Sequence, residues 1–168
     1  MFRETHADYS LLQNGAVNLF WRKELFEKSL NELRKLGYAL ISIRFESMES
    51  FLVQLSEGLR WHDQFGYAPW TGNLDALNDS LRDPPSFSPS GCLAICIEDF
   101  DKLVSADREF AWKLLDILEY QSRDNLLFGR KLVALIQTND NRYEAANIGA
   151  RHAQWNRYEW QWSNRGIG

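Results

Sequence analysis

The sequence has few of the residue types that build covalent or metal-bound structures. Its only cysteines are Cys92 and Cys96, and four residues apart on an extended segment they lie about 13 Å from each other, too far for a disulfide. We interpret both as small apolar residues of a buried strand. The histidines His6, His62 and His152 are scattered without the spacing of metal ligands. We therefore expect no metal and no other cofactor.

Long apolar runs and catalytic motifs are missing as well. Runs such as YALISI and LAICI are too short to span a bilayer, and the polar start MFRETHADYS lacks the apolar segment of a secretory signal. The chain has no GxSxG, GxxxxGK[ST] or HExxH motif. We expect a cytoplasmic protein that binds no membrane and is not an enzyme.

One group of acids leaves an enzymatic alternative open. Glu98, Asp99 and Asp101 stand at the end of an expected strand, which is where a metal site of an α/β fold would lie. The same three acids could instead begin a loop and stabilise the positively polarised N-terminus of the next helix. We favour that second interpretation, and magnesium-dependent hydrolysis of a phosphate ester is the alternative.

An excess of positive charge is also missing. The 168 residues carry a formal net charge of −4 and a pI of about 5.4, so the basic face of a nucleic-acid-binding protein is not predicted. Between residues 75 and 124 there are eleven acids against five bases, so this stretch carries −6 and the remainder of the chain +2. Such asymmetry steers a protein toward a basic partner.

Helical and extended patterns alternate along the chain, whose length suits one domain. An amphipathic helix is expected over 20–36, ended by Gly37, and a helix after the N-cap Ser47. The expected strands are 38–46, 92–100 and 131–140, and the other helices are 48–61, 73–83 and 106–124. Strands separated by helical crossovers predict an α/β fold with a largely parallel sheet.

The short helix expected over 73–83 has an acidic face. Its leucines form a core stripe, and Asp75, Asp79 and Asp83 follow one another a turn apart on a face away from that stripe. Asn73 as N-cap and Asp75 beside the positive helix end fit ordinary helix capping. Asp79 and Asp83 do not, because the helix dipole disfavours carboxylates there. The spacing of these aspartates alone does not decide between an ordinary solvated surface and a partner-binding face.

Aromatic residues cluster before that helix and at the C-terminal end. Trp70 is equally consistent with an interface anchor and with a lid on the core. In the tail, Tyr158, Trp160 and Trp162 alternate among arginines. Stacking on nucleic-acid bases is one interpretation of this pattern. We favour an extended arm that packs one aromatic face onto the domain.

The order of elements together with GNLDAL at residues 72–77 resembles the barstar family of ribonuclease inhibitors. The resemblance covers about residues 38–138. It implies a barstar-like domain with a three-stranded parallel sheet flanked by helices. Residues 1–37 would form an N-terminal extension with an amphipathic helix, and residues 139–168 a C-terminal aromatic extension packed on the domain.

The resemblance also implies a function. A barstar-like protein is an inhibitor, an immunity or antitoxin protein, that blocks the active site of a nuclease toxin, here a ribonuclease above all. Asp75 and Asp79 match the two helix aspartates that meet basic residues of the nuclease, and Asn73 and Leu74 match the residues at the helix start. A further acid of the family corresponds to Glu119, with Tyr120 as the competing position. The expected partner is a basic nuclease, bound by a monomer in a one-to-one complex.

The sequence departs from the family pattern at two places. Gly72 stands one position later than the family glycine, and of the aromatic pair before it only Trp70 is kept. Asn78 occupies a position where founding members carry tryptophan, which removes apolar contact area and suggests a different partner. The alternative is therefore a barstar-like interaction or regulatory module whose partner is not a nuclease.

Overall fold

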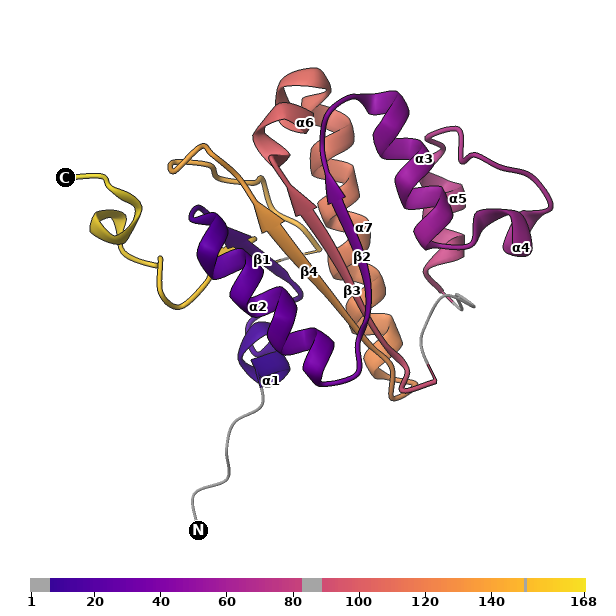
Figure 1. Ribbon diagram of the computed structural model, residues 1–168, viewed down its shortest axis with the longest axis horizontal. Helices are drawn as coiled ribbons and strands as arrows, with labels where there is room; N and C mark the ends of the chain where they lie inside the picture. The colour runs from indigo at the N-terminus through magenta and orange to yellow at the C-terminus, as the bar shows by residue number, and fades with distance from the viewer. Residues whose placement is uncertain (1–6, 83–88, 150) are drawn as a thin grey trace, which may run out of the picture.

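The computed structural model describes residues 7–82, 89–149 and 151–168. A parallel sheet runs through the centre with strand order β2-β3-β4-β1-β5. The three strands that the hydrophobic runs predict lie side by side, and two shorter strands follow at one edge (Figure 1). The strands are β1 (Val17–Phe20), β2 (Ala39–Arg44), β3 (Cys92–Glu98), β4 (Lys131–Gln137) and β5 (Gln154–Trp155).

Helices cover both faces of this sheet. In Figure 1 α2 crosses one face and α7 runs along the other, with α3 and α5 beside it. The first face carries α1 (Ala7–Leu12) and α2 (Lys23–Lys35). The opposite face carries α3 (Met48–Gly58), α4 (Trp61–Phe65), α5 (Leu74–Ser80), α6 (Phe100–Ala106) and α7 (Arg108–Leu126), and a short 3₁₀-helix, η1 (Trp162–Arg165), lies near the C-terminus.

Side-chain alternation along the strands divides the core in two. On β3, Leu93, Ile95 and Ile97 face the layer of α3, α5 and α7, whereas Ala94 and Cys96 face the layer of α1 and α2. Because both faces are covered, the strand is apolar at nearly every position, as is usual for parallel sheets. The hydrophobic run that marked it in the sequence is a direct result of this two-sided burial.

The predicted α/β fold, a parallel sheet flanked by helices, is confirmed. The predicted number of three strands is wrong, because the sheet has five. Both extensions beyond residues 38–138 enter it: β1 pairs in parallel with β4, and β5 pairs with β1. A four-residue and a two-residue strand are too short for a pattern of period two to identify.

Helix boundaries also differ from the expected ones. The helix expected over 20–36 begins at Lys23, because Phe20 is the last residue of β1. The helix expected over 73–83 ends at Ser80. Asp83, expected on the acidic face, lies outside the described residues.

The C-terminal aromatic residues do not pack as expected. Tyr158, Trp160 and Trp162 are each 45–58% exposed and lie outside any strand, so the expectation of a packed aromatic face is wrong for these three rings. The segment is held by other groups. Trp155 lies in β5, and the guanidinium of Arg165 stacks 4.3 Å from its ring centre.

Candidate functional site

Helix α5 owes its position to capping and to one buried face. The side chain of Asn73 accepts a hydrogen bond from the backbone N–H of Ala76 at 3.1 Å, which is the expected N-cap. Leu77 and Leu81 are fully buried in the core. Leu74 at the helix start is only half-buried. The helix therefore turns the face opposite its leucines toward solvent.

Asp75 and Asp79 occupy this solvent-facing side of α5, one turn apart. The Asp79 side chain is 63% exposed, and its ion pair with Arg82 has a long separation of 3.6 Å. Exposed pairs of this kind contribute little free energy. Asp75 is exposed, and its carboxylate forms no hydrogen bond or ion pair with any residue in the described ranges. Both carboxylates are thus free to accept hydrogen bonds from a partner.

Trp70 is a buried residue that contacts the start of α5. It is 1% exposed, and its ring lies 5.6 Å from that of Trp61 and 6.0 Å from that of Phe110. Its indole N–H donates a hydrogen bond to the carbonyl of Asn73 at 2.8 Å. Of the two interpretations of this tryptophan, the structure agrees with the lid on the core. It connects that core to the residue that caps the acidic helix.

Gly72 forms the turn between Trp70 and the helix. Its φ of +90° lies in the left-handed region, which favours glycine over residues with a side chain. A Cβ at this position would stand 3.7 Å from the Leu52 side chain, an ordinary contact. The conformation of the turn, and not crowding, therefore explains the glycine.

Helices α7 and α4 fix α5 from its two sides. The side-chain amide of Gln121 on α7 donates to Asn78 Oδ1 at 2.8 Å, and that of Asn125 donates to the Leu81 carbonyl at 3.0 Å. On the other side, Gln64 Nε2 donates to Ser80 Oγ at 3.0 Å. Nothing in the sequence pattern singles out these amides, because hydrogen-bonding amides have no characteristic spacing.

Glu119 lies away from the acidic face. It is 1% exposed, and its Oε2 accepts a hydrogen bond from the backbone N–H of Ala16 at 2.8 Å, just before β1. Its nearest cation is Arg151 at 3.9 Å. Placed there, the carboxylate is buried and holds the N-terminal extension. The next residue, Tyr120, is 53% exposed.

At the carboxyl end of the sheet, Glu98 and Asp99 form ion pairs with bases, and Asp101 accepts hydrogen bonds from Asn139. Lys23 contacts Glu98 at 3.1 Å and Asp99 at 3.2 Å. Burial raises the pKa of the Asp99 carboxyl, but hydrogen bonds from Asn139, Lys23 and Lys102 outweigh it and hold the pKa at about 2. Across the described residues, no three His, Cys, Asp or Glu side chains are placed to hold a metal ion. The arrangement is a network of ion pairs.

A membrane-spanning helix is not found either, since no described helix combines the necessary length and apolarity.

Comparison with known proteins gives one match. A family model described as Barstar (barnase inhibitor) matches residues 40–137, which is more than half of the chain and runs from β2 to the end of β4. No curated protein and no solved structure matches the chain.

Proposed function

The chain belongs to the barstar family, and on that premise we propose that it inhibits a nuclease, above all a ribonuclease, by covering the basic active site with the exposed face of α5. The family description itself names inhibition of barnase. The observation that carries the proposal is the pair of exposed aspartates, Asp75 and Asp79, on a helix whose other sides are fixed to the core.

Charge supports this choice of partner. An active site that binds nucleic acid is rich in Arg and Lys because it must neutralise phosphates. Carboxylates one helical turn apart offer such a site charge-assisted hydrogen bonds, which with arginine are often bidentate. In the complex of barnase with barstar, the founding pair of this family, close charges across the interface are strongly coupled. The long-range field of the acidic stretch would also accelerate encounter.

The fixed position of α5 also supports the proposed inhibition. Association costs less when the contacting side chains stand on an element that does not need to be ordered first. Helix α5 is capped by Asn73 and held by hydrogen bonds from α4 and α7. Its two aspartates are therefore presented in one fixed relative position.

We assign roles to the candidate residues accordingly. Asp75 and Asp79 meet the cations of the nuclease, and the residues around them form the rim of the contact. That rim consists of Gly72, Asn73, Leu74 and Asn78. Trp70 and Glu119 are buried, so Trp70 holds the start of α5 in place and Glu119 holds the N-terminal extension.

An RNA-cleavage assay tests the proposal. Barnase and the basic ribonucleases of the source organism would each be titrated with this protein while cleavage of a fluorogenic RNA is followed. Against the nuclease it inhibits, we expect Asp79→Ala to weaken inhibition by about 2 kcal/mol or more. Glu46→Gln is the matched control, because Glu46 is exposed and lies before α3, away from α5. It should change inhibition by less than about 0.5 kcal/mol.

Two results would contradict the proposal. One is failure to inhibit any ribonuclease of the panel. The other is binding of a protein partner that survives Asp75→Lys combined with Asp79→Lys, since reversing both charges must oppose a basic site. The second result would favour an interaction module with a non-nuclease partner.

A further inference from the structure

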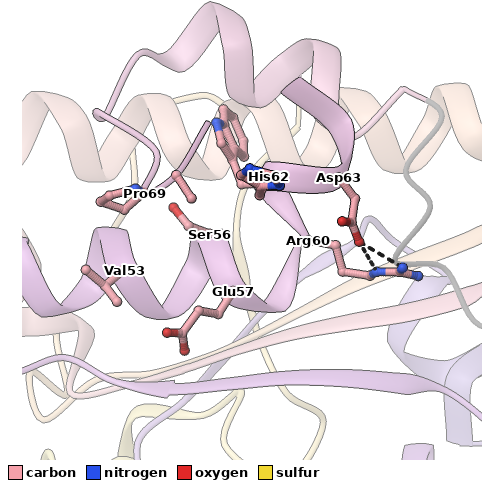
Figure 2. A pocket seen from close by; sticks show the side chains of 9 residues that line it. Val53, Ser56, Glu57, Arg60, His62, Asp63 and Pro69 are labelled. Atoms are coloured by element: carbon pink, nitrogen blue, oxygen red, sulfur yellow. Dashed lines mark hydrogen bonds and ion pairs between the residues drawn. The ribbon is translucent and has the colours of Figure 1, made fainter. Parts of the chain in front are cut away.

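A pocket of about 490 Å³ opens between α3 and the segment from α4 to the turn before α5. Figure 2 shows Val53, Ser56 and Glu57 on α3, with His62 and Asp63 on the short helix and Pro69 in the loop across from them. Ser56 and Glu57 follow Val53 by three and four residues on α3, so one face of this helix forms one side of the pocket, and Arg60 lies just beyond the end of α3.

Hydrogen bonds connect the pocket to the start of α5, which carries the proposed inhibitory surface. Ser56 lines the pocket and its Oγ accepts a hydrogen bond from the backbone N–H of Trp70. Trp70 in turn donates from its indole to Asn73, the N-cap of α5. The wall of the pocket and the start of the acidic helix are therefore two ends of one hydrogen-bonded chain. Two hydrogen bonds, both made by Trp70, thus separate the pocket lining from the N-terminal end of α5.

The chemistry of the lining is apolar inside and acidic at the rim. Val53, Trp61 and Pro69 provide apolar surface. Arg60 and Asp63 neutralise each other through an ion pair of 2.8 Å. Glu57 lines the pocket, is exposed and has no ion pair within the described ranges. Figure 2 shows its side chain extending below α3, on the other side of the helix from Ser56 and Pro69. The pocket thus carries one uncompensated negative charge.

We propose that this pocket receives a lysine or arginine side chain of the nuclease, with the aliphatic stem against Val53 and Pro69 and the cationic head at Glu57. Long basic side chains bury their stems on apolar surface while the head stays at a wet or charged edge. The inference rests on the proposed function, because it needs a basic partner seated on α5. It adds a second anchor beside the acidic helix.

This anchor also fits the composition of the α5 surface. The exposed face of α5 offers carboxylates but little apolar area, since Leu77 and Leu81 are buried and Asn78 is polar. Interfaces commonly combine charged contacts with an anchor that fills a pocket. An acidic rim excludes an aspartate or glutamate of the partner, so the pocket would also select among nucleases.

The first test needs no nuclease. The full chain labelled with nitrogen-15 is titrated with butylguanidinium at low ionic strength, and with butanol as the neutral control. We expect saturable shifts confined to the backbone amides of the pocket and the indole N–H of Trp61, with weaker binding of butanol. Glu57→Gln should weaken the guanidinium by about threefold to fivefold, and Glu46→Gln by less than about 1.5-fold. Equal binding by both variants overturns the proposal.

The second test separates this inference from the proposed function. With the nuclease that the protein inhibits, Glu57→Gln and a variant that fills the pocket, Ala68→Trp, should both raise the inhibition constant by about threefold or more, with Glu46→Gln unchanged. If Asp79→Ala abolishes inhibition but both pocket variants inhibit like the wild type, the inhibitory function stands and the pocket proposal fails. If Asp79→Ala has no effect, the proposed function itself fails.

Discussion

The side-chain amide of Gln121 donates a hydrogen bond to Asn78 Oδ1 at 2.8 Å, which ties the middle of α5 to α7. Gln121 is fully buried, and its Oε1 has no hydrogen-bond partner in the described part of the chain. The amide therefore depends on Asn78 for its one side-chain hydrogen bond across this helix pair. Asn78, between the two aspartates of the acidic face, is thus a structural residue as well as a rim residue.

Replacing Asn78 tests this dependence. In Asn78→Ala, Gln121 Nε2 loses its acceptor in a buried position, so the free energy of unfolding should fall by about 1–3 kcal/mol. Urea denaturation followed by circular dichroism measures the change. Asp79→Ala, one residue further on the same helix but exposed, should cost less than about 0.5 kcal/mol. Equal losses for the two variants would show that the hydrogen bond between Gln121 and Asn78 does not contribute to the free energy of unfolding.

Trp70 allows the hydrogen bond and the ring to be tested separately. Trp70→Phe keeps an aromatic ring in the core but removes the indole donor to Asn73, and it should cost about 1–3 kcal/mol of unfolding free energy. Trp70→Ala should cost about 3–5 kcal/mol because it leaves a cavity. Trp162→Phe is the control on an exposed ring, with an expected change below about 0.5 kcal/mol. Thermal and urea unfolding of the three variants give the comparison.

The central part of the fold could be predicted because its signals are local. The apolar runs of β2, β3 and β4 follow from burial on both faces of a parallel sheet, and Ser47 accepts its hydrogen bond from Ser50 as its spacing predicts. The expected exposure of Asp75 and Asp79 follows from the helical period alone. These features need only neighbours in the sequence.

The rest depends on contacts between distant residues. β1 becomes a strand because it pairs with β4 more than a hundred residues later, and no pattern in four residues signals that partner. Glu119 has the spacing of a surface acid, but it becomes buried because the N–H of Ala16 arrives from the other end of the chain. Burial of a charge by a distant backbone group cannot be read from helical spacing.

Glu159 provides a third prediction, on how the two extensions are joined. Its buried carboxylate accepts hydrogen bonds from the backbone N–H groups of Trp21 at 2.9 Å and Arg22 at 3.1 Å. In Glu159→Gln an N–H₂ group must face one of these donors, so the unfolding free energy should fall by about 2–3 kcal/mol. Hydrogen exchange of the Trp21 and Arg22 amides should accelerate. Glu144→Gln, at an exposed position of the same extension, should leave both exchange rates unchanged.

Asp99 gives the last prediction, a dependence of stability on pH. The pKa of this carboxyl is about 2, below its ordinary value of 3.8. Because the folded protein holds the charged form more strongly than the unfolded chain does, the stabilisation is complete above about pH 4 and is lost as the pH falls toward about 2.

Asp99→Asn is a suitable variant for this measurement. Asp99 has a φ of +59°, a conformation that Asn tolerates about as well as Asp, so the backbone can remain in place. Urea unfolding at a series of pH values should show a wild type that is more stable at neutral pH, with the difference between the two proteins shrinking between about pH 4 and pH 2. Asn139→Ala removes the hydrogen-bond donor at 2.9 Å that helps to lower the pKa, so its pH-dependent loss of stability should be smaller and should be complete at a higher pH. A difference between wild type and Asp99→Asn that stays constant across this range would show that the ion-pair network does not stabilise the fold through the charge on Asp99.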